Sequence, residues 1–210
     1  MKDFTVEQWE SWFDSLAVDD YVVIDGFLTT ELLADAIHYF TYLDQQDAFK
    51  KAAIGNYQDQ VVINEVRGDY IHWLNRNENL FTKTLYKVLD QLKNNINRYC
   101  YLSLKDFEFH FAHYPKGSFY KKHLDQFSNR SNRLISVVLY LNIDWQEGDG
   151  GELKIYPNNR NEMTIQPLEN RLVLFKSDQL YHEVLVSNKS RKSITGWMLY
   201  QAVKKGALID

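Results

Sequence analysis

Two side chains able to bind a metal stand close together in the segment Lys121-Lys122-His123-Leu124-Asp125. In an extended strand successive side chains alternate between faces, so His123 and Asp125 point the same way and Leu124 points to the other side. One imidazole and one carboxylate then converge on a single point. A His-x-Asp pair alone is a weak signal, because most single histidines are surface or satisfied core residues.

A second imidazole, His182, strengthens the metal interpretation. It stands beside an apolar run, a polar turn follows at residues 187–190, and Arg191 opens a new strand. Two histidines and one carboxylate form a three-ligand face on a metal and leave the other coordination positions open, as in non-haem Fe(II) oxygenases. We expect His123 and Asp125 to come from one sheet and His182 from the other.

Arg191 is the cation that the same pattern places near this site. Alternation along the last predicted strand puts Arg191, Ser193, Thr195 and Trp197 on one face. If that face points inward, Arg191 is buried, and its guanidinium can bind a carboxylate through two parallel hydrogen bonds. A surface arginine after a turn is the alternative. Two features favour the buried position for Arg191: it shares a strand face with Ser193, Thr195 and Trp197, and it follows His182 by nine residues.

Three helices are predicted from apolar residues at helical spacing. The first follows a capping box formed by Thr5 and Gln8, and the second begins at Thr29 or Thr30. The third is long and runs from Asn77 or Glu78 to about residue 98.

Short strands separated by turn signals account for most of the rest of the chain. One is expected at residues 21–27, and eight follow the third helix, at 107–114, 119–124, 134–142, 153–156, 163–165, 171–176, 182–186 and 193–201. We therefore predict an α+β, mainly β fold, a double-stranded β-helix (jelly roll) with N-terminal and supporting helices packed on one sheet.

The segment from Phe49 to Leu74 differs in composition from its neighbours. Its first part is polar and contains glycine, and a strand-like run follows at residues 61–66. We interpret it as a long loop or surface hairpin, and long loops are more often functional than decorative. Arg67 and Asp69 at its end could pair with each other.

Length and composition predict a single domain over residues 1–210, with helical support and the loop in about 1–105 and a jelly-roll core in about 106–201. A net charge of −4 with interspersed basic residues argues against nucleic-acid binding. The one cysteine, Cys100, excludes an intramolecular disulfide and a cysteine-based zinc site. Without a signal-peptide pattern or a membrane-spanning run, we expect a cytoplasmic protein that does not bind membranes, and a monomer.

Several ordered motifs resemble the iron- and 2-oxoglutarate-dependent prolyl 4-hydroxylase family, in particular the oxygen-sensing type that acts on hypoxia-inducible factor and its bacterial relatives. The resemblance covers residues from about 109 to 200, with one further segment upstream. The motifs are Tyr114-Pro115, His123-Leu124-Asp125, residues 138–142 with Asp144-Trp145, Gly150-Gly151-Glu152-Leu153, His182-Glu183-Val184 with Arg191, and the upstream Arg67-Gly68-Asp69 with Trp73.

The resemblance implies Fe(II) as the metal, 2-oxoglutarate and O2 as cosubstrates, and ascorbate as a candidate reductant. His123, Asp125 and His182 would ligate the iron. Arg191 would anchor the far carboxylate of 2-oxoglutarate, with Tyr140 as its hydrogen-bonding partner. The matching pocket residues on the cosubstrate side are Thr195, Tyr114 and Trp197.

On the substrate side the resemblance points to Arg67, Asp69, Tyr120 and Arg133. In the family, the segment before Arg67 is a finger loop that closes over a polypeptide substrate. Strand alternation directs Arg133 away from the face that carries Tyr140, which argues against its role.

The implied reaction is hydroxylation of a prolyl residue in a protein, with 2-oxoglutarate converted to succinate and CO2. Bacterial members of this branch act on elongation factor Tu, so a translation factor is a candidate substrate. Two alternatives stay open. One is the same chemistry on a free amino acid or small metabolite, and the other is a non-catalytic, cupin-like module with a structural metal.

Overall fold

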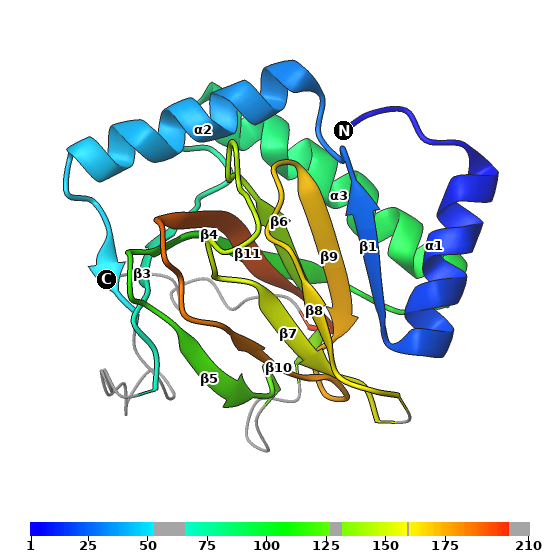
Figure 1. Ribbon diagram of the computed structural model, residues 1–210. Coiled ribbons are helices and arrows are strands. Elements are labelled where there is room, and N and C mark those ends of the chain that lie inside the picture. The colour runs from blue at the N-terminus through cyan, green and yellow to red at the C-terminus, as the bar shows by residue number, and fades with distance from the viewer. Residues whose placement is uncertain (53–65, 127–131, 159, 202–210) are drawn as a thin grey trace.

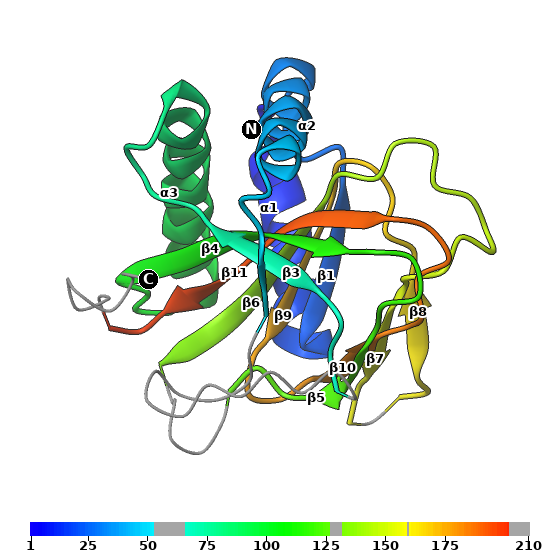
Figure 2. The same cartoon turned by 90° about the vertical axis from the view of Figure 1, so that its left-hand side faces the viewer.

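The computed structural model describes residues 1–52, 66–126, 132–158 and 160–201. Two sheets face each other, and three helices lie along the outer side of the larger sheet (Figure 1 and Figure 2). The predicted mainly β jelly roll with helices on one sheet is confirmed. The prediction of a single domain stays a prediction.

The helices begin at residues whose side chains satisfy free backbone N–H groups. Helix α1 (Val6–Asp19) starts at the predicted capping box, in which Thr5 and Gln8 bond reciprocally. Helix α2 (Thr30–Gln45) is capped by Thr29. Helix α3 (Leu80–Cys100) begins after its N-cap Asn79, slightly later than expected, because Asn79 and Thr82 form the capping box there.

The larger sheet is antiparallel and has the strand order β1-β9-β6-β11-β4-β3-β2. Its members are β1 (Tyr21–Asp25), β9 (Arg171–Lys176), β6 (Arg133–Tyr140), β11 (Arg191–Leu199), β4 (Asp106–Tyr114), β3 (Tyr70–Trp73) and β2 (Lys50–Lys51).

The smaller sheet has the order β5-β10-β7-β8. Its members are β5 (Tyr120–His123), β10 (Tyr181–Val184), β7 (Leu153–Tyr156) and β8 (Met163–Ile165).

Strands β2 and β3 were expected only as part of a loop or surface hairpin. They do pair with each other, but β3 also pairs with β4 and so extends the larger sheet. The strand-like run at residues 61–66 lies outside the described residues except for Val66.

Alternation along the central strands divides the core into two layers. Phe107, Phe109, Phe111, Ile194 and Met198 face the helices and belong to one buried cluster with them. The space between the sheets is filled by Tyr140 and by other side chains from both sheets and from the segment before β10, namely Val138, Leu153, Ile155, Ile165, Val173, Phe175 and Leu180. The polar residues of β11 that share this inner face therefore point into the interior of the jelly roll.

A β-bulge interrupts the pairing of β6 with β11. Met198 pairs with Ile135, but Leu199 pairs with Arg133, so one residue of β6 is extra. The guanidinium of Arg133 consequently lies on the inner face, with its Cζ 3.4 Å from the ring centroid of Trp197. The expected outward parity of Arg133 was wrong, because strict alternation does not hold across a bulge.

Within the described part of the chain, no helix has the length and apolar character needed to cross a bilayer.

Candidate metal centre

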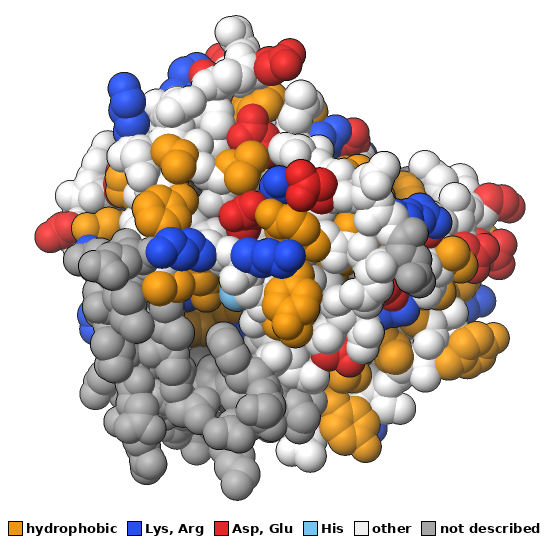
Figure 3. Space-filling view, turned by 60° about the horizontal axis from the view of Figure 1, so that its bottom comes forward, with side chains coloured by type: hydrophobic (Ala, Val, Ile, Leu, Met, Phe, Trp, Pro, Cys, Tyr) orange, Lys and Arg blue, Asp and Glu red, His pale blue; other side chains and the backbone are white. Residues whose placement is uncertain are grey.

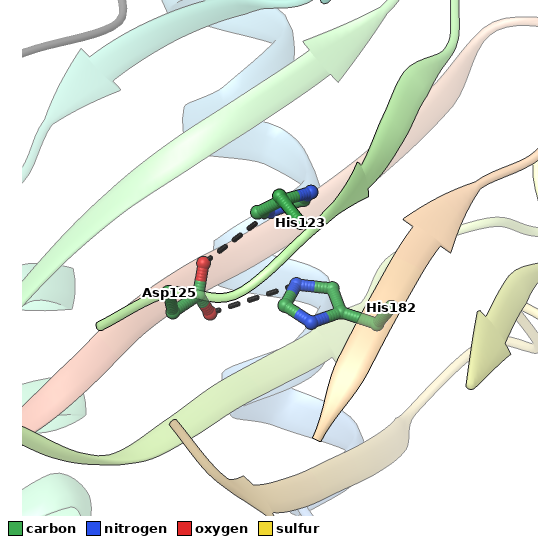
Figure 4. A group of neighbouring side chains, drawn as sticks. All are labelled: His123, Asp125 and His182. Carbon is green, nitrogen blue, oxygen red and sulfur yellow. Dashed lines mark ion pairs between the residues drawn. The ribbon is translucent and has the colours of Figure 1, made fainter. Parts of the chain in front are cut away.

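His123 and His182 face each other across neighbouring strands. They are direct partners in the pairing of β5 with β10, and their ring centroids lie 4.2 Å apart. The carboxylate of Asp125, just beyond β5, lies 3.4 Å from His123 Nε2 and 3.7 Å from His182 Nε2 (Figure 4). One ligand atom from each residue lies within 4.8 Å of the others, so the group could hold a metal ion.

Both histidines come from the smaller sheet, so the expectation that His182 belongs to the opposite sheet was wrong. Sequence spacing shows that two strands can meet, but not which sheet a four-residue strand joins.

Backbone carbonyls fix the tautomer of both rings. His123 Nδ1 lies 2.7 Å from the carbonyl oxygen of Lys121, and His182 Nδ1 lies 3.1 Å from that of Leu180. A carbonyl only accepts, so each Nδ1 carries the proton and each Nε2 presents its lone pair. Such outer hydrogen bonds orient metal-binding histidines. The two Nε2 atoms are thus prepared as ligands.

The third ligand is held from the larger sheet. Ser136 on β6 donates from Oγ to Asp125 Oδ2 at 2.6 Å, and its Oγ also lies 2.8 Å from Ser177 Oγ. Burial acts to raise the pKa of the Asp125 carboxyl, but His182, His123 and Ser136 outweigh it and hold that pKa below its ordinary value. Burial lowers the pKa of His182 to about 4, against the opposing effect of Asp125.

At neutral pH His182 is therefore uncharged and Asp125 is ionised. This donor set, with three ligands on one side, fits Fe(II) and leaves positions for small ligands.

Arg191 lies deeper in the interior and is 4 % exposed. Its Nε donates to the carbonyl oxygen of Gly151 at 2.8 Å, and its Cζ lies 4.8 and 4.9 Å from the ring centroids of Tyr114 and Tyr140. Among the described residues, Arg191 forms no ion pair with an acidic side chain, whereas Arg67, Arg133 and Arg171 each do. A buried charge without a counter-ion is unfavourable, so the position is suited to an anionic ligand.

Two features beside Arg191 fit the same anion. The hydroxyl of Tyr140 is buried and has no hydrogen-bond partner among the described residues. Gly151 has φ +75°, and a Cβ there would lie 2.9 Å from Arg191 Cδ. The glycine thus lets the backbone approach the arginine side chain closely. Thr195 lies between Arg191 and Trp197 on β11, and its Oγ1 is 3.0 Å from Ser193 Oγ.

Aromatic rings border the interior on the other side of the histidines. The ring of His110 on β4 contacts those of Trp73 and Trp197, with ring centroids 4.9 and 5.5 Å away, and the two tryptophan rings lie 6.5 Å from each other. Arg133 covers Trp197 and pairs with Glu108 at 2.7 Å. His110 and Glu108 were not predicted as site residues, although each shares the strand parity of Tyr114, which was the available signal.

Arg67, Asp69 and Tyr120 form one cluster next to His123. Arg67 donates two hydrogen bonds to Asp69, at 2.7 and 2.6 Å, which confirms the predicted pairing. The Cζ of Arg67 lies 4.4 Å from the ring centroid of Tyr120, whose ring stacks on His123 at 3.7 Å. The cluster therefore supports one side of the candidate metal site.

Turning the lower side of Figure 1 forward gives the surface in Figure 3. A histidine side chain is visible there at the edge of a hollow, with hydrophobic and basic side chains around it.

The comparisons with known proteins agree with this geometry. Residues 109–199 match the family model of the 2OG-Fe(II) oxygenase superfamily. A Pseudomonas putida prolyl-4-hydroxylase is 32 % identical, with a TM-score of 0.83, over 92 % of this chain and 100 % of that one.

Two eukaryotic structures are also similar. A Trichoplax adhaerens prolyl hydroxylase in complex with a peptide fragment of the hypoxia-inducible factor oxygen degradation domain is 28 % identical, with a TM-score of 0.82, over 95 % of this chain and 94 % of that one. A Phytophthora capsici prolyl 4-hydroxylase, at 24 % identity and a TM-score of 0.69 over 99 % of this chain and 69 % of that one, supports the fold.

Replacing Ser136 tests the support of the third ligand. We expect Ser136→Ala to weaken Mn(II) binding by about 10- to 100-fold, because Asp125 loses the hydroxyl that orients it. Calorimetric titration of the metal-free protein would measure this. Ser103→Ala, at an exposed position, is the matched control. Equal affinities in the two variants would contradict a role for Ser136.

Buried His110 should make the fold sensitive to acid. Burial lowers its pKa to about 3, so the native state stays unprotonated where the unfolded chain, with a pKa of about 6.5, takes up a proton. Stability from this group is therefore present above pH 6.5 and is lost as pH falls. Between pH 7 and 5 the loss is about 2 kcal/mol.

Urea unfolding of the wild type and of His110→Phe at both pH values would measure that loss. Between pH 7 and pH 5, the free energy of unfolding of His110→Phe should fall by less than that of the wild type. The difference between the two decreases should equal the loss attributed to His110. Identical pH dependence would show that His110 is not buried in its neutral form.

Proposed function

Because this chain belongs to the prolyl 4-hydroxylase family of the 2OG-Fe(II) oxygenases, we propose that it hydroxylates a prolyl residue in a protein substrate and releases succinate and CO2. The proposal is carried by one observation. A three-ligand group and a buried arginine without an acidic partner among the described residues border the same interior, because His182 packs against Phe175 and Arg191 packs against Tyr140 of one buried cluster.

We assign His123, Asp125 and His182 as the iron ligands. The backbone carbonyls of Lys121 and Leu180 hold both imidazoles with Nε2 unprotonated, and Ser136 keeps the carboxylate turned toward them. The ligand set therefore binds a divalent ion without rearrangement. Bound Fe(II), together with 2-oxoglutarate and O2, supplies the oxidising power that couples oxidative decarboxylation to C–H hydroxylation.

Arg191 is proposed to anchor 2-oxoglutarate. Its guanidinium can donate two parallel hydrogen bonds to the far carboxylate, and Tyr140 can donate a third from its buried hydroxyl. The rings of Tyr114 and Tyr140 exclude water from this end and strengthen the charge pairing. The cosubstrate's other end then points toward the histidines.

A polypeptide is the substrate that the opposite end favours. Trp73, Trp197 and His110 form an aromatic wall that suits an apolar pyrrolidine ring, and Arg133 and Glu108 provide polar groups at its border. The structure of the similar Trichoplax enzyme is a complex with a peptide fragment. Elongation factor Tu is the first candidate to test, and ascorbate is the candidate reductant.

Two other functions remain to be separated from this one. A free amino acid or small metabolite would use the same iron site but not an extended peptide surface. A structural metal in a cupin-like module would not need a buried arginine beside open coordination positions.

Substitution of Arg191 tests the cosubstrate assignment. We expect Arg191→Ala to raise the KM for 2-oxoglutarate by roughly 100-fold or more, since two charge-assisted hydrogen bonds are lost. The KM of Arg191→Lys should lie between those of the wild type and of Arg191→Ala, because lysine keeps the positive charge but lacks the planar guanidinium. Succinate formation with Fe(II) and O2 is the readout. Arg160→Ala, at an exposed arginine, is the control, and an unchanged KM in Arg191→Ala would refute the anchor.

Mass spectrometry tests the substrate class. Incubation of the enzyme with elongation factor Tu and with a cell lysate should add one oxygen atom to a specific proline. His182→Ala should abolish the product, because a ligand is lost. Succinate production without any modified protein would favour a small-molecule substrate. Absence of succinate from the iron-loaded wild type would instead support the non-catalytic module.

A further inference from the structure

A second group of chemically competent side chains lies on the opposite face of the same strands. Asp44 is in the last turn of α2, His113 is on β4, and Ser190 immediately precedes β11. His113 pairs directly with Lys192, and its ring packs against Phe40 on the helix side of the sheet. The group is therefore separated from the iron site by the larger sheet itself.

The three side chains are connected in series. His113 Nε2 lies 2.9 Å from Ser190 Oγ, and His113 Nδ1 lies 3.2 Å from Asp44 Oδ1. An ionised carboxylate only accepts, so Asp44 favours the tautomer with the proton on Nδ1. Nε2 is then left with a lone pair directed at the Ser190 hydroxyl. This order of nucleophile, base and orienting acid is the one that activates serine hydroxyls in acyl transfer.

The surroundings of His113 keep the ring in its basic form. Burial lowers the pKa of its imidazole, Asp44 acts in the opposite direction, and Lys192 lowers that pKa further. Ser190 is exposed and open to reagents, and the His113 side chain is 17 % exposed. The hydroxyl is thus accessible, and its base is shielded.

A cation lies on the same face of the sheet as His113. Lys192 is the cross-strand partner of His113, and its Nζ lies 5.3 Å from the ring centroid of Phe40, which His113 also contacts. Serine, histidine, carboxylate and cation therefore share one surface.

We propose that Ser190 is an activated nucleophile that takes the acyl group of small carboxylic esters, independently of the iron site. Ser190 Oγ bonds to the ester carbonyl carbon, and its proton passes to His113 Nε2. The tetrahedral adduct then breaks its bond to the alcohol, which leaves with that proton. Water, deprotonated by His113, cleaves the acyl-serine and regenerates the hydroxyl.

Labelling of the full-length wild type with a fluorophosphonate, followed by peptide mass spectrometry, is the primary test. We expect the adduct on Ser190. Hydrolysis of p-nitrophenyl acetate should exceed the rate in buffer and fall about 100-fold in Ser190→Ala and in His113→Gln, because nucleophile or base is removed. Asp44→Asn should lower the rate and leave the fold intact, since that carboxylate is at the surface.

Two control variants separate this chemistry from other sources. Ser103→Ala, which removes another exposed hydroxyl, should hydrolyse the ester at the wild-type rate. His182→Ala should keep the esterase rate and lose succinate formation. An unlabelled Ser190 in the wild type, or equal rates in Ser190→Ala and Ser103→Ala, would overturn the proposal. Those results would leave the three side chains as a tether between α2 and β11.

Discussion

The register of β11 between β4 and β6 determines which side chains face the interior of the jelly roll and which face the helices. A slip of one residue would exchange Arg191 with Lys192 and turn every polar group of the strand to the wrong side. Gly196 contributes to this register, because a Cβ there would lie 2.2 Å from the carbonyl oxygen of Glu108 and 2.5 Å from the ring of Phe109. The close approach of Gly196 to β4 thus helps to determine which side chains of β11 face the interior and which face the helices.

Features that depend on local periodicity could be predicted from the sequence. The inward position of Arg191 follows from a two-residue repeat, and the start of α1 follows from Thr5 and Gln8. Features that depend on how strands associate could not. The bulge that turns Arg133 inward and the placement of the His182 strand in the smaller sheet arise from pairing between distant segments. Extension of the larger sheet by β3 was missed for the same reason.

Two arginines in the interior differ in how their charge is balanced. Arg67 forms two hydrogen bonds to Asp69, which is 1 % exposed, and removing one partner of such a buried pair typically destabilises a protein by about 3–5 kcal/mol. Arg191 contacts a carbonyl and two aromatic rings instead. The internal pair therefore stabilises the wall beside His123, whereas no acidic side chain among the described residues pairs with Arg191. Residue type alone does not distinguish these roles, but the presence of a nearby acid does.

Adjacent residues at the start of β11 serve opposite sides of one sheet. The Arg191 side chain points into the interior of the jelly roll, and the Ser190 side chain contacts His113 on the helix side. The sheet is a single hydrogen-bonded layer at this point, so a displacement of the backbone at Ser190 is transmitted directly to Arg191. His113 on β4, which is paired with Asp44 on α2, contacts the Ser190 hydroxyl, and Gly151 approaches the Arg191 side chain from the interior. The position of the guanidinium is therefore determined from both faces, which explains how a nine-residue strand can orient a charge that no acidic side chain among the described residues neutralises.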